Sequence, residues 1–275
     1  IANSRGIPTL QAFFSEDVAQ GILKKEGPAS LITAANVFAH VANLGPCLRG
    51  IHALLGDRGT FISESHYLLD LIDTLQYDTI YHEHLRFYSI KPMQDMMKRF
   101  GFSVVDAERI PNHGGSIRGY AVTGTEKNPS GRLQELVKQE DAYGLYETAL
   151  YTTFAQRVRQ SKWKLMHLLS DLKMKGHRIA GIGSPGRSST VMNYCGIGPD
   201  YLDYTAEQAT SLKVGLFTPG THVPVVDEKR LFEDQPEYAL VLAWHLGETI
   251  PRKLRSKGLR SKFIMPLPDP VILDW

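Results

Sequence analysis

The 275 residues of this chain exceed one average domain and suffice for two. Hydrophobic residues make up 43% and charged residues 22%, as in ordinary globular proteins. Because the net charge is only +2, the sequence offers no general electrostatic attraction to nucleic acid or to an anionic membrane. No apolar run approaches the roughly 20 residues that span a bilayer. We therefore expect a cytoplasmic protein that binds neither nucleic acid nor a membrane.

The cysteines and the start of the chain narrow the class further. Cys47 and Cys195 lie far apart without CxxC spacing, which suits a reducing compartment and excludes a cysteine-based metal site within this chain. The chain opens at Ile1, without an initiator methionine or a signal-like segment, and soon enters a pattern of strands and helices. We therefore expect the protein to have a part that precedes Ile1.

The first half alternates short apolar runs with helical segments. Residues 9–14 predict a buried strand, and Ser15 with the two acids after it predicts the start of a helix. Further strands are predicted at 30–35, 59–64, 102–109 and 116–124, and further helices at 44–55 and 91–100. Such alternation favours a mostly parallel sheet with covered faces.

The second half begins with a change of pattern. Residues 129–176 are strongly helical and charged, which predicts one or two bridging helices. A second alternating unit follows, with strands at 177–182, 201–206, 223–226, 238–243 and 263–266, and helices from 187 and at 248–257. The sequence therefore predicts an α/β fold with two Rossmann-like three-layer domains, at 1–128 and 177–275, joined by long helices.

A glycine-rich loop follows the first strand of this second unit. Gly181, Gly183 and Gly186 complete a G-x-G-x-x-G pattern, Arg187 comes next, and Glu207 closes the next strand. Glycines let backbone N–H groups approach a phosphate at a helix N-terminus. The loop could hold the pyrophosphate of a nicotinamide dinucleotide or of a nucleotide diphosphate sugar, or it could be a plain tight turn.

The densest group of reactive side chains lies at residues 81–84, which read Tyr-His-Glu-His. The H-x-H spacing could bind a metal, but no third ligand is obvious, so we expect no metal site. The histidines could also be solvated surface residues. A third interpretation is a general base, because imidazole titrates near neutrality and removes protons without a metal.

Two halves of the sequence independently resemble one family. Residues 78–89 (DTIYHEHLRFYS) and 113–118 (HGGSIR) resemble the sugar C-methyltransferases of deoxysugar biosynthesis. Residues 183–196 (GSPGRSSTVMNYCG) and 213–226 (KVGLFTPGTHVPVV) resemble the C-terminal domain of the same enzymes. The resemblance runs in unbroken order from about Gly6 to the end of the chain.

This resemblance implies a three-part enzyme: an N-terminal zinc lobe, a class I methyltransferase domain and a C-terminal nucleotide-sugar-binding domain. The zinc lobe, the first strands of the methyltransferase fold and its glycine-rich cofactor loop are missing from this chain. The cofactor implied is S-adenosylmethionine. Phe14 would lie near its adenine, and Ala35, Asn36 and His40 near its methionine moiety.

The implied reaction is methyl transfer to a carbon of a nucleotide-linked keto sugar through an enolate. His84 would be the base, supported by Tyr81 and Glu83. The residues on the sugar or phosphate side would be His82, His113 and Arg118.

The C-terminal domain would hold the nucleotide, which we expect to be dTDP. Position 187 is arginine where the family commonly has lysine. The diphosphate would be held by Gly183, Gly186, Arg187, Ser188 and Asn193, with Glu207 and Lys213 beside the nucleoside. Two alternatives are an NAD(P)-dependent enzyme that uses the Gly181–Gly186 loop and a non-catalytic module that binds nucleotide sugars.

Overall fold

The computed structural model describes residues 1–56, 59–124 and 127–274. The chain forms two compact units. The first consists of Ile1–Tyr67, Leu85–Ile110 and Ser116–Tyr143, and the second of Leu68–His84, Pro111–Gly115 and Gly144–Trp275. Residues 68–84 and 111–115, which we expected inside a first domain, therefore belong to the second unit.

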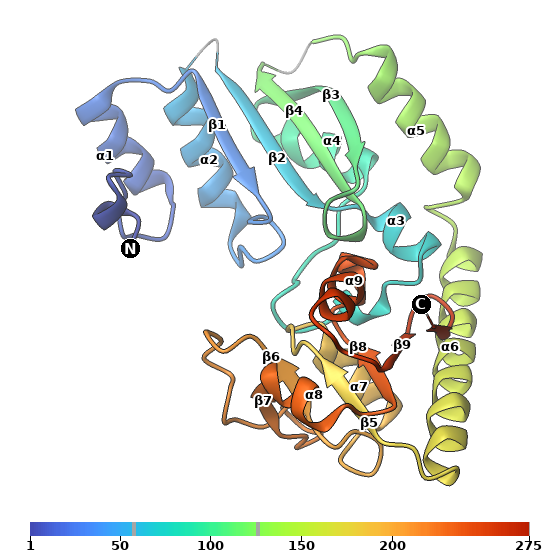
Figure 1. The fold of residues 1–275 in the computed structure, drawn as a ribbon. Coiled ribbons are helices and arrows are strands. Elements are labelled where there is room, and N and C mark those ends of the chain that lie inside the picture. The colour runs from blue at the N-terminus through green and yellow to red at the C-terminus, as the bar shows by residue number, and fades with distance from the viewer. Residues whose placement is uncertain (57–58, 125–126, 275) are drawn as a thin grey trace. The chain divides into compact units, whose positions relative to one another are not determined.

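The first unit is built on a four-stranded sheet (Figure 1). Its elements are η1 (Asn3–Arg5), α1 (Glu16–Glu26), β1 (Leu31–Ala35), α2 (Leu44–Leu55), β2 (Thr60–His66), α4 (Ile90–Arg99), β3 (Phe102–Ile110), β4 (Ser116–Thr123) and α5 (Gly131–Tyr143). The strand order is β1-β2-β4-β3, with β1 parallel to β2, and β4 antiparallel to both its neighbours. The sheet is mixed rather than mostly parallel, because the short connection from β3 to β4 permits only an antiparallel pair.

Local sequence signals determine the first helices. α1 begins after Ser15, whose side-chain oxygen accepts a hydrogen bond from the Val18 N–H at 3.3 Å, as an N-cap does. α2 has the bounds that its apolar spacing predicts. It packs with α4 on one face of the sheet, where the rings of Phe61 and Phe102 lie 6.3 Å apart.

The expected strand at residues 9–14 does not form. The side chain of Asn3 donates to the Thr9 carbonyl at 2.9 Å and accepts from the Thr9 N–H at 2.7 Å. A side chain therefore satisfies the backbone groups that a neighbouring strand would otherwise bind. Phe13 is fully exposed and Phe14 is 37% exposed, so the strand that would have placed Phe14 beside a cofactor is a wrong prediction.

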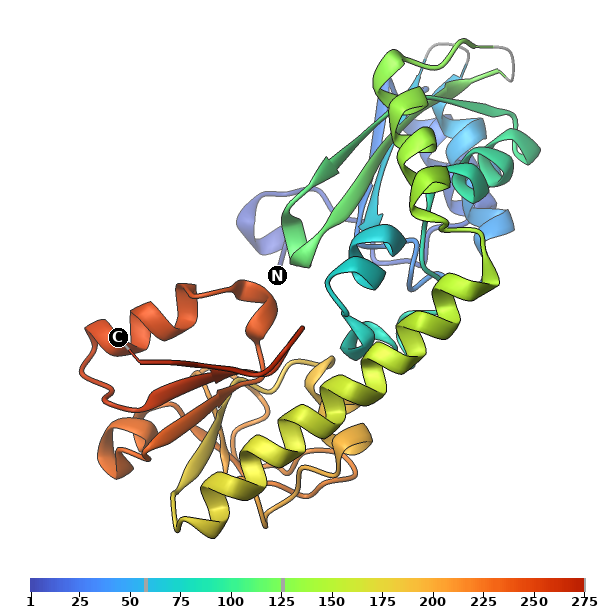
Figure 2. The same ribbon diagram turned by 90° about the vertical axis from the view of Figure 1, so that its right-hand side faces the viewer.

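The second unit is a six-stranded α/β fold (Figure 2). Its elements are α3 (Leu68–Asp73), η3 (Tyr77–Thr79), η4 (Asn112–Gly114), α6 (Thr148–Met174), β5 (Ile179–Ile182), α7 (Ser188–Cys195), β6 (Thr205–Glu207), β7 (Val225–Asp227), α8 (Lys229–Asp234), β8 (Tyr238–Val241), η5 (Trp244–Leu246), α9 (Thr249–Ser256), β9 (Lys262–Met265) and β10 (Val271–Leu273). The strand order is β10-β9-β8-β5-β6-β7, and β10 alone among these strands is antiparallel to its neighbour. The order reverses between β5 and β8, which is where ligands bind in open α/β sheets.

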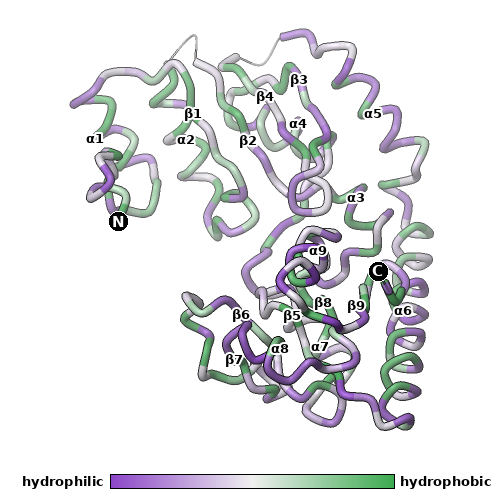
Figure 3. The backbone as a smooth tube through the Cα atoms, in the orientation of Figure 1, coloured by the Kyte–Doolittle hydropathy of each residue, from purple (hydrophilic) through white to green (hydrophobic). Residues whose placement is uncertain are grey.

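Each face of this sheet is covered by its own helices. Leu240 and Ile264 pack with α6 and α7, whereas Val241 and Phe263 pack with α8 and α9. The alternation follows from the two-residue period of a strand, and the apolar stripe of α6 is visible in Figure 3. The predicted α/β class with Rossmann-like units is confirmed.

Residues 68–84 are anchored in the core of the second unit. Leu75 and Tyr77 are buried in the cluster that α6 and α7 form. Arg157 of α6 donates to the carbonyl oxygens of Ile72 and Asp73, at 3.0 and 2.8 Å, at the C-terminal end of α3. These contacts explain why the segment with the Tyr-His-Glu-His motif belongs to this unit. Across the described ranges, no helix is both long and apolar enough to cross a bilayer.

Candidate functional site

The predicted base His84 lies in the turns that follow η3. Its Nδ1 atom is 2.7 Å from the carbonyl oxygen of Thr79. Because a carbonyl can only accept, Nδ1 carries the hydrogen and Nε2 carries the lone pair. The half-buried ring therefore has the tautomer of a base that acts through Nε2.

Tyr81 lies between this histidine and the glycine-rich loop. Its ring centroid is 4.4 Å from that of His84. A Cβ atom on Gly186 would lie 3.2 Å from the Tyr81 ring, so the ring packs directly on the loop backbone. Burial, and then the Glu83 carboxylate, raises the pKa of Tyr81, which keeps its hydroxyl protonated. Glu83 and His82 are themselves exposed.

Arg187 is engaged in a buried ion pair. Its Nε and Nη2 atoms donate to the two carboxylate oxygens of Asp78 at 2.6 and 2.8 Å, and Nη2 also lies 3.2 Å from Gln76 Oε1. The indole of Trp244 donates to Asp78 at 2.7 Å. Asp78 is fully buried and Arg187 is 6% exposed. The guanidinium that we expected to bind diphosphate therefore binds a carboxylate of this chain.

The loop after β5 is held by the two residues predicted to lie beside the nucleoside. Glu207 accepts a hydrogen bond from the Ser184 N–H at 2.6 Å, and Lys213 Nζ donates to the Ser184 carbonyl oxygen at 2.5 Å. Gly183 has a φ of +76°, a conformation that glycine adopts without strain. Both side chains thus fix one peptide of the loop at the switch point.

The first turn of α7 continues this loop. Ser188 is buried, and its hydroxyl donates to the Pro185 carbonyl at 2.7 Å. Asn193 donates to the carbonyl of Pro219 at 3.0 Å. A Cβ atom on Gly220 would lie 2.1 Å from Asn193 Oδ1, so this position requires glycine. The predicted residues of the loop and of α7 are therefore brought together in one unit.

His113 belongs to η4, in the same unit. It is exposed, with a φ of +55°. A Cβ atom on Gly115 would lie 2.5 Å from the Asp70 side chain, and one on Gly114 would lie 2.8 Å from Gln76. The two glycines therefore allow η4 to pack against α3 and the residues that follow it.

One histidine in this region was missed by the sequence analysis. His245 follows β8 at the switch point, and its buried Nδ1 atom has no hydrogen-bond partner among the described residues. Burial, and then the positive charge of Arg187, lowers the pKa of His245 to about 4. The sequence signal that could have found it is its place after a parallel strand beside the glycine-rich loop.

The predicted cofactor residues lie in the first unit. Ala35 ends β1, and Asn36 follows with a φ of +54° and its N–H bound to the Glu64 carbonyl at 2.8 Å. His40 lies four residues further and is exposed. A cavity of about 250 Å³ opens beside the end of β1, lined by Thr33, Ala34, Ala35, Ile62, Glu64, Arg118 and Tyr120.

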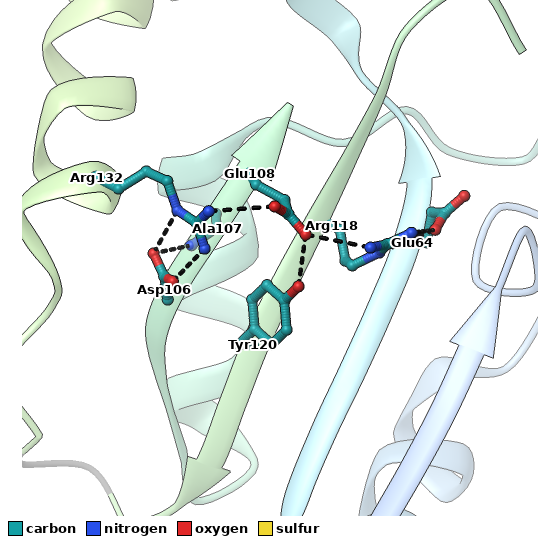
Figure 4. A network of polar contacts seen from close by, with 7 residues as sticks. All are labelled: Glu64, Asp106, Ala107, Glu108, Arg118, Tyr120 and Arg132. Carbon is teal, nitrogen blue, oxygen red and sulfur yellow. Dashed lines mark hydrogen bonds and ion pairs between the residues drawn. The ribbon is translucent and has the colours of Figure 1, made fainter. Parts of the chain in front are cut away.

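Arg118 lies on β4, at the edge of this cavity, within a network of charges (Figure 4). It donates through Nε and Nη2 to Glu64 Oε2, at 3.1 and 2.9 Å, and through Nη1 to Glu108 at 3.2 Å. Tyr120 donates to the same Glu108 oxygen at 2.5 Å, and the resulting bond lowers the pKa of Glu108. Arg118, expected on the sugar side with His113, is thus in the first unit and bound to carboxylates.

The site residues fall into two groups. Tyr81, His82, Glu83, His84 and His113 lie in the second unit with the glycine-rich loop, whereas Ala35, Asn36, His40 and Arg118 lie in the first. Within the part of the chain that the structure describes, no cluster of three or more His, Cys, Asp or Glu side chains could hold a metal ion.

Comparison with known proteins agrees with this division of the chain. Residues 111–268 match the family described as C-methyltransferase C-terminal domain, and residues 2–107 match a methyltransferase domain family. The whole chain is 30% identical, over 278 aligned residues, to C-methyltransferase NovU of Streptomyces niveus. The chain spans 66% of the length of that relative.

Proposed function

Because this chain belongs to the C-methyltransferase family, we propose that the protein transfers the methyl group of S-adenosylmethionine to a carbon of a dTDP-linked keto sugar. The observation that carries the proposal is the orientation of His84, whose Nδ1–H is bound to the Thr79 carbonyl at 2.7 Å. The family supports C-methylation, and the histidine supplies the base that this reaction needs.

A carbon becomes nucleophilic when a base removes a proton beside a keto group. In the proposed reaction, Nε2 of His84 takes this proton, and the electron pair of the C–H bond remains on the substrate as an enolate. The Thr79 carbonyl then stabilises the imidazolium through the Nδ1 hydrogen. The Tyr81 hydroxyl, kept protonated by its raised pKa, is suited to donate to the enolate oxygen.

The sugar nucleotide is proposed to bind at the switch point of the second unit. Gly183 and Gly186 open the loop to a diphosphate, and the N-terminal end of α7 favours negative charge. Ser188 and Asn193 lie in that helix, and His82 and His113 are exposed nearby in the same unit. Glu207 and Lys213 would act by shaping the loop through Ser184.

S-adenosylmethionine, when bound, supplies an electrophilic methyl carbon on a sulfonium. The residues that would hold it are those around the cavity at the end of β1: Ala35 lines it, and Asn36 and His40 follow. Small side chains at Ala34 and Ala35 leave room for a ligand, and the Glu64 carboxylate offers an acceptor, so the cavity fits part of such a molecule. Phe14 is proposed here only as an exposed ring of the same unit.

The test separates proton abstraction from methyl transfer. The full-length protein is incubated in D₂O with dTDP-4-keto-6-deoxyglucose as the test sugar, and NMR follows deuterium exchange beside the keto group. Addition of methyl-¹³C-labelled cofactor is then expected to give a new C–¹³CH₃ signal. His84→Asn keeps a hydrogen-bonding side chain but removes the base, and it is expected to abolish both signals. Full exchange by this variant would refute the role of His84.

The same experiment decides between the alternatives. Binding of dTDP without exchange or methyl transfer would support a non-catalytic nucleotide-sugar module. Stabilisation by nicotinamide dinucleotide rather than by dTDP would support the dinucleotide interpretation of the loop. The family match favours methyl transfer over both.

A further inference from the structure

A buried ion pair ties the segment that carries His84 to the glycine-rich loop. Three N–H groups converge on the Asp78 carboxylate, two from Arg187 and one from Trp244. Removing these charges from water is costly, and an apolar pair of similar volume often gives equal or greater stability. What a bidentate arginine adds is a fixed direction between two pieces of backbone.

The pair fixes the turn that presents the Thr79 carbonyl. Asp78 precedes Thr79 in η3, so any shift of its carboxylate moves this carbonyl group. At the other end of the turn, Gln76 lies 3.2 Å from Arg187 Nη2, and its carbonyl accepts from both the N–H and the hydroxyl of Thr79, at 3.1 and 2.8 Å. Arg187 therefore contacts both ends of the turn that orients His84.

Two further contacts hold the same segment to the loop and to α7. The Tyr81 ring packs on the backbone of Gly186, the residue before Arg187. The Thr190 hydroxyl donates to the carbonyl of Ile80 at 3.2 Å. The segment from Gln76 to His84 thus follows the loop after β5 through several independent contacts.

From these contacts we propose that Asp78 and Arg187 are positioning residues, which couple the glycine-rich loop to the orientation of the His84 ring. The proposal rests on the proposed role of His84 as the base. The path runs from Arg187 through Asp78 and the Thr79 carbonyl to Nδ1 of His84. A diphosphate that orders the loop would thereby also order the base, although Arg187 itself does not contact the phosphate.

The first test reads the histidine ring directly. Long-range ¹H–¹⁵N NMR of the full-length protein distinguishes the two neutral tautomers of His84, with His84→Asn identifying the signal. We expect the Nδ1–H tautomer in the wild type and a mixture of tautomers in Arg187→Lys and Asp78→Asn. The matched control is Arg178→Gln, which removes the Asp203 ion pair at the opposite end of β5. Unchanged His84 signals in Arg187→Lys would overturn the proposal.

The second test separates positioning from phosphate binding. A positioning role predicts that Arg187→Lys lowers the deuterium-exchange rate with dTDP-4-keto-6-deoxyglucose about 10- to 100-fold, as loss of supporting contacts does at other sites. The affinity for dTDP then stays close to that of the wild type. A direct phosphate contact predicts the reverse, a weaker dTDP affinity and KM with an unchanged rate at saturation.

The outcomes distinguish this proposal from the proposed function. If His84→Asn retains wild-type exchange, the role of the base fails and the positioning role fails with it. If His84→Asn is inactive while Arg187→Lys behaves like Arg178→Gln, only the positioning role fails. Because Asp78→Asn leaves a buried arginine unpaired and can prevent folding, the charge-preserving Arg187→Lys carries the decision.

Discussion

The stability of the second unit is predicted to depend on pH through His245. The pKa of this ring is lowered from its ordinary value of 6.5 to about 4, mainly by burial and next by Arg187, with Asp78 opposing and His113 reinforcing the shift. Between these two values the unfolded chain binds a proton that the folded chain does not. The free energy of unfolding therefore rises with pH through this window, and the contribution is lost as the pH falls from about 6.5 to about 4.

The size of this effect follows from the shift. At 1.36 kcal/mol per pKa unit, the shift corresponds to a ceiling of about 3 kcal/mol. Solvent screens a ring that is partly exposed, which reduces the expected value to about 1–2 kcal/mol. This is a substantial part of the stability of a typical domain.

Urea unfolding measures this contribution. Tryptophan fluorescence follows the second unit through Trp163 and Trp244. Wild type is compared with His245→Gln, which cannot titrate, and with His167→Gln, which removes an exposed histidine of α6. Between neutral pH and pH 4, wild type and His167→Gln are expected to lose about 1–2 kcal/mol more than His245→Gln. Equal losses in all three proteins would refute the reasoning.

Three substitutions test the packing of the units by melting temperature. Gly220→Ala places a Cβ atom 2.1 Å from Asn193 Oδ1 at a φ of +80°, and is expected to cost more than about 2 kcal/mol; a wild-type melting temperature would contradict this. Leu169→Ala opens a cavity in a fully buried position and is expected to cost about 2–5 kcal/mol, while a loss below 1 kcal/mol would show that the site collapses. Glu140 accepts from the Ile90 N–H at 2.7 Å at the start of α4, so Glu140→Ala is expected to cost about 1–3 kcal/mol and Glu140→Gln much less; equal losses would exclude this bond as the cause.

The elements that the sequence predicts correctly are those with local causes. α2 and α7 follow from apolar spacing and from the residues at their ends. The strand at residues 9–14 failed because a strand also needs a partner, and the Asn3 side chain satisfies Thr9 instead. α3 was missed because Leu68–Asp73 is largely buried and lacks an exposed polar face.

The candidate site follows the same rule. The Tyr-His-Glu-His motif and the glycine-rich loop are visible as short patterns, and the structure brings them together in one unit. The partner of Arg187 could not be predicted, because Asp78 lies 109 residues away in the sequence. A free arginine beside a phosphate loop and an arginine paired with a distant carboxylate have the same local sequence. His245 was missed for a related reason, since only burial gives it an unusual pKa.

The division of the chain into interleaved segments has a consequence for engineering. A C-terminal fragment that starts at Gly144 would lack Leu75 and Tyr77, whose side chains fill part of its own core. Such a fragment would expose an apolar hollow and be prone to aggregate. A chimera that exchanges acceptor specificity between relatives should therefore transplant residues 68–84 and 111–115 together with everything from residue 144 onward. Cutting at a single junction would mix incompatible halves of one core.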